Sequence, residues 1–203
     1  CQNMEGVIIK PAMDKQGNGV KLLTVKNGKT NVDNKTIGEV FKQYNHNFLI
    51  QERVRQHRDL AALNPTSVNT LRILTYRSGM EVLVIYAVIR IGRSGQVIDN
   101  QCAGGISTTI GKDGKLGKVA FGGFSEDNVQ VTDSGITLEG YQLPSFDKAI
   151  EFVKRLHMKL PYFNIIGWDV SIEEDGEPIL IEYNTNVGLS QSAFCSGMGE
   201  NTE

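Results

Sequence analysis

Two strand-like segments on either side of Asp175-Gly176 place the strongest constraint on the fold of this chain. An Asp-Gly pair between alternating apolar residues is a typical signal of a β-hairpin. If the turn is symmetric about this pair, Asp169 lies directly opposite Glu182 on the neighbouring strand. The same register gives one wholly apolar face, made by the pairs Trp168 with Tyr183, Val170 with Ile181, and Ile172 with Ile179.

Asp169, Glu182 and Asn184 then share the opposite, polar face of the hairpin. Like charges on directly opposed side chains are destabilising, so the two carboxylates need compensation. A Mg²⁺ ion provides it, because this cation prefers one or two carboxylates together with other oxygen ligands such as an amide. The alternative is an acidic pair at a sheet edge whose charges diverge into water, and an odd number of turn residues would break the register.

The charge and hydropathy of the whole chain exclude several classes of protein. Its 203 residues include 21 basic and 23 acidic side chains, which gives a formal net charge of −2. We therefore expect neither a nucleic acid nor a membrane as partner, and any important positive charge must be local. No apolar run approaches the roughly 20 residues that cross a bilayer and no signal peptide is evident, which predicts a cytoplasmic protein. The 3 scattered cysteines indicate neither a disulfide framework nor a zinc site.

A glycine-containing loop near the start of the chain is the second candidate site. Residues 7–11 and 20–25 are predicted strands, and Gly17 and Gly19 lie in the loop between them. Glycines let backbone N–H groups converge on phosphate oxygens, and Lys10 adds a positive charge where the loop begins. An ordinary hairpin turn with an exposed lysine has the same pattern, and the chain lacks the Gly-Lys-Ser/Thr signature of a Walker loop.

The remaining pattern predicts an α+β fold that is rich in strands. A capping box formed by Thr36 and Glu39 predicts a helix that begins near Ile37. A second helix, capped by Ser145, is expected over residues 145–160. Further strands are expected over residues 48–50, 71–76, 81–91, 164–173 and 178–184.

Together these motifs resemble the ATP-grasp superfamily. The shared features are the strand that ends in Lys10-Pro11 before the glycine loop, the segment Leu49-Ile50-Gln51-Glu52-Arg53-Val54, and the terminal motifs Trp168-Asp169 and Glu182-Tyr183-Asn184. Residues 67–73, which include Arg72, resemble the branch of sugar-transfer-associated or α-L-glutamate-ligase-related ATP-grasp proteins. The resemblance extends over residues 7–191.

The resemblance implies two α+β subdomains, residues 1–54 and 55–203, that hold ATP between antiparallel sheets. In the first subdomain, Lys10 would contact the phosphates, and the glycine loop would cover them as a lid. The backbone of the hinge after the fourth strand would face the adenine edge. The nucleotide-binding residues implied in this way are Lys10, Gly17, Gly19, Gln51, Glu52 and Val54.

In the second subdomain, the resemblance assigns Asp169, Glu182 and Asn184 to Mg²⁺, with Mn²⁺ as a substitute. It assigns Arg72 and Arg90 to the γ-phosphate or to an acyl phosphate. Phosphoryl transfer depends on positioning and charge neutralisation, which these residue types supply. Both arginines alternate with apolar neighbours, so a solvated sheet face accounts for them equally well.

Two other polar residues, His57 and Asp59, are weaker candidates. His57 and Asp59 follow the hinge, where the resemblance would bring them near the ribose, but a histidine in a basic loop is more often solvated. His157 lies on the flank of the second expected helix and receives no role.

The implied activity is a ligase in which ATP phosphorylates a small-molecule carboxylate and an amine then displaces phosphate. The alternatives are a phosphotransferase or non-catalytic nucleotide-binding module of the same fold, and a β-rich interaction domain with a merely solvated acidic hairpin. The branch name suggests polysaccharide biosynthesis. Family members carry a further lysine and a domain upstream, so we expect the N-terminal part of the fold to be missing here. The oligomeric state does not follow from the sequence.

Overall fold

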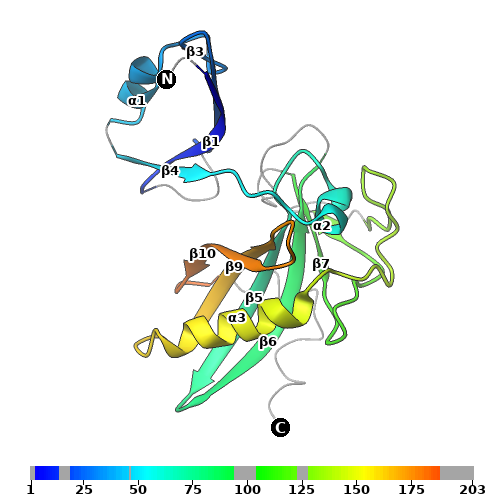
Figure 1. Cartoon of the computed structure of the whole chain (residues 1–203). Coiled ribbons are helices and arrows are strands. Elements are labelled where there is room, and N and C mark those ends of the chain that lie inside the picture. Colours follow the sequence, from blue (N-terminus) through cyan, green and yellow to red (C-terminus); the bar gives the residue numbers. More distant parts are fainter. Residues whose placement is uncertain (1–2, 14–18, 46, 94–103, 123–127, 188–203) are drawn as a thin grey trace. The chain divides into compact units, whose positions relative to one another are not determined.

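The computed structural model describes residues 3–13, 19–45, 47–93, 104–122 and 128–187 of the chain (Figure 1). The chain divides into two compact units, Cys1–Val54 and Arg55–Glu203. Each unit combines an antiparallel sheet with helices, so the α+β class predicted from the sequence is confirmed.

The smaller unit is built on four antiparallel strands and one helix. The strands are β1 (Asn3–Pro11), β2 (Lys21–Lys26), β3 (Lys29–Thr30) and β4 (Phe48–Glu52), in the sheet order β3-β2-β1-β4. Helix α1 (Ile37–Gln43) begins as predicted, because Thr36 and Glu39 form a complete capping box. Val40 of α1 packs with Ile9 and Leu23 of the sheet in a small core.

The larger unit is a six-stranded antiparallel sheet covered by a helix. Its strands are β5 (Thr70–Ser78), β6 (Glu81–Ile91), β7 (Ile106–Thr109), β8 (Phe121–Gly122), β9 (Ile165–Ile172) and β10 (Pro178–Asn184), in the sheet order β10-β9-β5-β6-β7-β8. Helix α3 (Phe146–Met158) lies across one face of this sheet in Figure 1. Val153 of the helix packs with Ile89 and Trp168 of the strands, so the main core lies between α3 and the sheet.

The start of α3 differs from its prediction in one respect. Ser145 precedes the helix as expected, but it has the left-handed backbone φ of 49°, and its side chain makes no capping hydrogen bond. The predicted helix is therefore confirmed and the predicted Ser145 cap is wrong.

A short helix, α2 (Arg58–Leu63), is not indicated by the sequence pattern. Only Leu60 and Leu63 of this helix are fully buried, and two apolar positions are too few to establish a helical period. It connects the start of the larger unit to β5.

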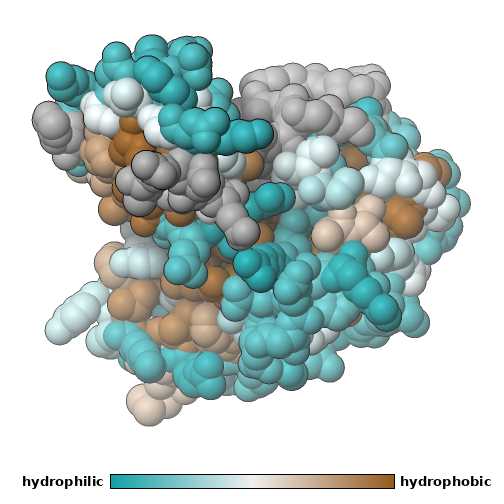
Figure 2. Space-filling view, turned by 45° about the horizontal axis from the view of Figure 1, so that its top comes forward, coloured by the Kyte–Doolittle hydropathy of each residue, from teal (hydrophilic) through white to brown (hydrophobic). Residues whose placement is uncertain are grey.

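Figure 2 shows hydrophobic side chains at the surface of the larger unit, among hydrophilic ones. No helix in the described ranges combines the length and the hydrophobicity that a bilayer crossing requires.

Candidate functional site

One face of the larger sheet brings the predicted metal ligands and arginines together. β9 lies between β10 and β5, so that Asp169 pairs with Glu182 on one side and with Arg72 on the other. On the next strand, Arg90 pairs with Thr70, which precedes Arg72 by two residues and therefore shares its face. This face is opposite the core residues that pack under α3.

The hairpin formed by β9 and β10 has the predicted pairing where the site lies and a different pairing near its turn. Asp169 is opposite Glu182, and Trp168 is opposite Tyr183, as predicted. The other two predicted pairs are wrong; the pairs found near the turn are Val170 with Leu180, Ser171 with Ile179 and Ile172 with Pro178.

Two irregularities explain this result. The backbone N–H of Glu173 donates to the Glu177 carbonyl at 2.9 Å, so the turn encloses residues 174–176, and Gly176 has the left-handed φ of 82°. The register is thus shifted by one residue from the symmetric one. A bulge between Leu180 and Glu182 shifts it back, which places Glu182 beside Asp169.

Asp169 is held by two arginine side chains. Arg72 donates from Nε to Oδ1 and from Nη2 to Oδ2, the latter at 2.8 Å, and Arg90 Nη2 lies 2.9 Å from Oδ2. Arg90 also donates to Thr70 Oγ1 at 3.0 Å from Nε and 2.9 Å from Nη2. The Asp169 side chain is 1% exposed, and those of Arg72 and Arg90 are 12% and 11% exposed. Two alternatives from the sequence are therefore wrong. Arg72 and Arg90 do not lie on a solvated sheet face, and the charge of Asp169 does not point into water.

The two opposed carboxyl groups have pKa values shifted in opposite directions. Burial by itself raises the pKa of Asp169, but the charge of Arg90 and the hydrogen bond and charge of Arg72 outweigh it and hold the pKa below its ordinary value. Partial desolvation of its carboxyl, followed by the hydrogen bond and charge of Asp169, raises the pKa of Glu182, although this residue as a whole is exposed. Asn184 Nδ2 donates to Glu182 Oε1 at 3.3 Å, which partly opposes that rise.

The oxygen donors on this face fit a hard divalent cation such as Mg²⁺. Asp169 and Glu182 supply carboxylate oxygens, and the bond from Asn184 to Glu182 uses the amide nitrogen and leaves the amide oxygen for a ligand. Oδ2 of Asp169 meets both Arg72 and Arg90, whereas Oδ1 accepts from Arg72 and has a second acceptor position that a cation can use. Among the described residues, no three His, Cys, Asp or Glu side chains gather closely enough to hold a metal, so the amide is needed to complete the set.

In the smaller unit, Lys10 and Gln51 share the sheet face that α1 does not cover. Lys10 pairs with Leu49, and Ile8 pairs with Gln51, and directly paired residues lie on the same face. Ile9, which alternates with them, is buried in the core with α1. A positive charge and an amide therefore stand beside apolar side chains on one face, a combination suited to a ligand with both phosphate and ring portions.

The other predicted nucleotide-binding residues are arranged differently. Glu52 pairs with Val7, so its side chain lies on the α1 side of the sheet and not beside Gln51. Val54 follows the end of β4 and is half-buried. Gly19 has a φ of 72° and accepts a hydrogen bond from Tyr44 Oη at 2.7 Å, while Gly17 lies outside the described residues.

The first residues of the larger unit form a polar pocket that the sequence analysis missed. Gln56 Nε2 donates to the Ser67 carbonyl at 2.8 Å, and its Oε1 accepts from the backbone of Asn69 at 2.7 Å. Gln56 lines a cavity of about 450 Å³ together with His57, Arg58 and Glu174. The sequence gives little indication of this pocket, because a glutamine between two basic residues is typical of an exposed loop. The contacts that fix Gln56 come from Ser67 and Asn69, which precede β5.

His57 has a local structural role beside this pocket. Its Nδ1 accepts from the backbone N–H of Asp59 at 3.3 Å and so caps α2. The residue is half-buried, so it is not simply a solvated histidine. A contact of His57 or Asp59 with a ribose stays a prediction.

His157, to which the sequence assigns no role, is fully buried in a hydrogen-bonded chain. Its Nε2 lies 2.9 Å from the Phe163 carbonyl, and its Nδ1 lies 2.7 Å from Thr75 Oγ1. A carbonyl only accepts, so Nε2 carries the proton, and in the neutral ring Nδ1 accepts from the Thr75 hydroxyl. Thr75 in turn accepts from Trp168 Nε1 at 2.7 Å. This network stabilises the core side of the sheet.

Two solved structures are similar to this chain at low sequence identity. The L-amino acid ligase from Bacillus licheniformis is 12% identical with a TM-score of 0.48, and the match covers 94% of this chain and 34% of that one. The biotin carboxylase domain of the Hydrogenobacter thermophilus 2-oxoglutarate carboxylase, solved with MgADP, ADP and bicarbonate, is 10% identical with a TM-score of 0.48 over 93% of this chain and 32% of that one. This chain thus spans about a third of each of these proteins. No curated protein matches it significantly.

A protein-family comparison covers nearly the whole sequence. The model of the sugar-transfer-associated ATP-grasp family matches residues 1–201. The α+β architecture with antiparallel sheets is consistent with this match. The chain therefore belongs to the sugar-transfer-associated ATP-grasp family, as the order of its motifs predicts.

Proposed function

We propose that this chain is part of an ATP- and Mg²⁺-dependent ligase that joins a carboxylate to an amine through an acyl phosphate. The observation that carries the proposal is the opposition of Asp169 and Glu182 across β9 and β10, on the same face as Arg72 and Arg90. The two arginines share the single charge of Asp169, which leaves an excess of positive charge for a phosphate, and the opposed carboxyl groups offer oxygen ligands for a cation; these are the two parts of a magnesium–phosphate site.

The electrostatics of the pair favour a divalent cation at Glu182. In the absence of one, Arg72 and Arg90 hold the pKa of Asp169 low, whereas desolvation, followed by the hydrogen bond and charge of Asp169, raises the pKa of Glu182, and the charge of Arg90 opposes that rise only in part. Asp169, Glu182 and Asn184 would hold Mg²⁺, which when bound supplies charge neutralisation for the phosphate oxygens. A bound cation would also allow both carboxyl groups to be ionised together.

Arg72 and Arg90 would act on the transferred phosphoryl group. Their guanidinium groups are nearly buried, where charge-assisted hydrogen bonds to an anion are strong. In the proposed reaction, a substrate carboxylate oxygen attacks the terminal phosphorus of ATP and ADP leaves. The amine then attacks the acyl carbon, the C–O bond to phosphate breaks, and the amine proton passes to solvent. The arginines would stabilise negative charge on the phosphoryl group in both steps.

The smaller unit would contribute the nucleotide contacts. Lys10 would bind the phosphates as a point charge, and the backbone of Gln51 through Val54 would meet the adenine edge. The Lys10 face of β1 and β4 supports this role, because α1 leaves it uncovered and apolar Leu49 on it is 48% exposed.

Calorimetric titration of ATP with and without Mg²⁺ tests the metal site. We expect Mg²⁺ to tighten ATP binding at least tenfold in the wild type, and Glu182→Ala to abolish most of that gain. Glu177→Ala is the matched control, because Glu177 is an exposed carboxylate of the same hairpin and lies outside the residues that line the pocket of Gln56 and His57. Mg²⁺-independent binding, or equal losses in both variants, would overturn the metal assignment.

Product analysis separates the ligase from a phosphotransferase of the same fold. A ligase releases ADP and phosphate only when a carboxylate and an amine are both present. ADP release with an acceptor alone and a stable phosphorylated product would instead identify a phosphotransferase. Nucleotide binding without any turnover would favour the non-catalytic module.

A further inference from the structure

The larger unit exposes a cluster of large apolar side chains at one end of its sheet. Met80 and Tyr162 are the most exposed, at 83% and 92%. We name this cluster the apolar end; its members are Tyr76, Met80, Leu83, Tyr162, Phe163 and Ile165. A cluster of exposed apolar residues of this size is unusual for a protein surface that only meets water.

Three members of the apolar end form a continuous row. Tyr76 pairs with Leu83 on one side and with Ile165 on the other, so these three side chains form a row across β6, β5 and β9. The backbone N–H of Arg77 donates to the Asn164 carbonyl at 2.7 Å, which ties the loop after α3 to the β5 strand. In Figure 1, the turn between β5 and β6 and the loop between α3 and β9 both lie at the lower left of the larger unit.

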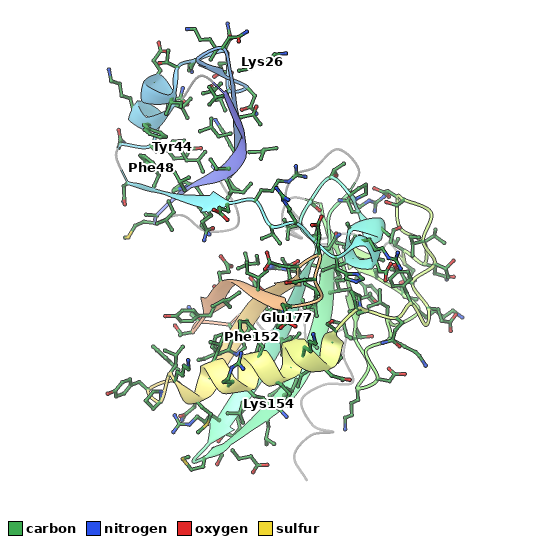
Figure 3. All side chains as sticks on the ribbon, viewed as in Figure 1. Lys26, Tyr44, Phe48, Phe152, Lys154 and Glu177 are labelled. Atoms are coloured by element: carbon green, nitrogen blue, oxygen red, sulfur yellow. The ribbon has the colours of Figure 1, made fainter. Side chains whose placement is uncertain are left out.

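Positive charge surrounds this end, although the chain as a whole has a net charge of −2. Arg77 borders the β5–β6 turn, where its Nε donates to the Gly79 carbonyl at 2.8 Å. Arg155 and Lys159 are exposed at the end of α3, which leads into the Tyr162 loop. Glu81 is the acidic residue of the β5–β6 turn. Lys154, which Figure 3 labels on α3, is compensated by Glu151 of the same helix, with 3.4 Å between Nζ and Oε1.

We propose that the apolar end is a docking surface for an anionic lipid membrane, against the expectation drawn from the net charge of the whole chain, because the positive charge here is local. Tyr and Met side chains that project from turns can enter the interfacial region of a bilayer, and flanking Arg and Lys residues attract anionic headgroups. A protein partner would require a surface of about 800 Å² on each side with good complementarity. Met80 and Tyr162 instead project from two separate turns, each almost fully exposed. The proposal is independent of the chemistry proposed for the Asp169 face.

Co-sedimentation with vesicles tests the apolar contribution. We expect the chain to bind mixed phosphatidylcholine–phosphatidylglycerol vesicles and to bind pure phosphatidylcholine vesicles much more weakly. The double variant Met80→Ser/Tyr162→Ser should lower the partition coefficient by about tenfold for each side chain, which corresponds to about 1.4 kcal/mol each. The control is Met13→Ser, which removes an 87% exposed methionine from the other unit. Equal binding by wild type and double variant, or an equal loss in the control, would overturn the proposal.

A separate variant tests the contribution of the basic residues to membrane binding. Arg155→Gln/Lys159→Gln should reduce the preference for phosphatidylglycerol, and added salt should weaken wild-type binding in the same way. Unchanged melting temperatures show that the variants are folded. Sedimentation velocity of the same proteins without lipid tests whether a second copy of the chain binds to the apolar end. If the wild type forms dimers that Met80→Ser/Tyr162→Ser dissociates, the apolar end binds a second copy of the chain and the membrane proposal fails.

Discussion

Replacement of Asp169 by Asn tests whether the arginine pairing stabilises the larger unit. The variant keeps the size of the side chain but removes the charge that compensates Arg72 and Arg90, which are only 12% and 11% exposed. Loss of one partner from a buried ion pair costs about 3–5 kcal/mol. Asn retains one acceptor oxygen and the guanidinium groups reach some solvent, so we expect the lower end, about 3 kcal/mol.

Urea unfolding followed by tryptophan fluorescence measures this loss. Trp168 is the only tryptophan in the sequence, and it is 1% exposed. Because it is next to Asp169 on β9, its fluorescence reports the unfolding of the larger unit. With a urea dependence of about 2 kcal/mol/M, the expected loss lowers the unfolding midpoint by about 1.5 M.

Glu182→Gln is the matched control for Asp169→Asn. It alters the opposite carboxyl of the same pair, and it removes a like charge instead of a counter-charge. We expect it to raise the neutral-pH midpoint, because the raised pKa means that ionised Glu182 is unfavourable in the folded state. An Asp169→Asn midpoint equal to the wild-type value, or a similar fall in both variants, would refute the reasoning.

Two further predictions concern the pH dependence of stability and the buried network. The pKa of Glu182 is raised on folding, so its contribution to stability is complete below its ordinary value of 4.5 and is lost as the pH rises through the folded value. Urea midpoints of Glu182→Gln should therefore exceed those of the wild type at neutral pH and converge with them in acid; a constant difference would contradict this. Thr75→Val leaves the Trp168 indole N–H and the His157 ring without their partner, which should cost about 2–4 kcal/mol by the same fluorescence assay, while Thr75→Ser keeps the hydroxyl and most of the stability.

The carboxylate pair could be predicted because it depends on local chain geometry. Alternating apolar residues fixed which side chains of the hairpin face the core, and Asp175-Gly176 located the turn. The prediction of a symmetric turn was wrong, and so were the pairs of Val170 and Ile172. Asp169 and Glu182 still face each other because the extra turn residue and the bulge offset each other, and nothing in the sequence marks that bulge.

The arginine contacts could not be predicted, because they depend on which distant strands become neighbours. Arg72 and Asp169 are 97 residues apart in the chain, and they meet only because β9 inserts between β5 and β10. Alternation along β5 placed Arg72 away from the core, but it did not identify the partner strand. The burial of His157 was missed for a similar reason, since its partners Thr75 and Phe163 lie outside α3.

In the smaller unit, the capping box gave a reliable helix start because it depends on residues only three apart. The face shared by Lys10 and Gln51 required the pairing of β1 with β4, which are separated in the chain by β2, β3 and α1. Long-range pairing was again what the sequence pattern could not supply.

The bulge at Ile181 also determines how this hairpin can tolerate insertions and deletions. If the register near the turn continued unchanged, Glu182 would lie opposite Trp168 and would face the core. The extra residue in the turn and the extra residue in the bulge each shift the strand register by one. A change of one residue in only one of them would move Glu182 to the other face of the sheet, whereas a matched change in both would leave it in place. The turn can therefore vary among related proteins, provided that each odd change in its length is accompanied by one in the strand that follows.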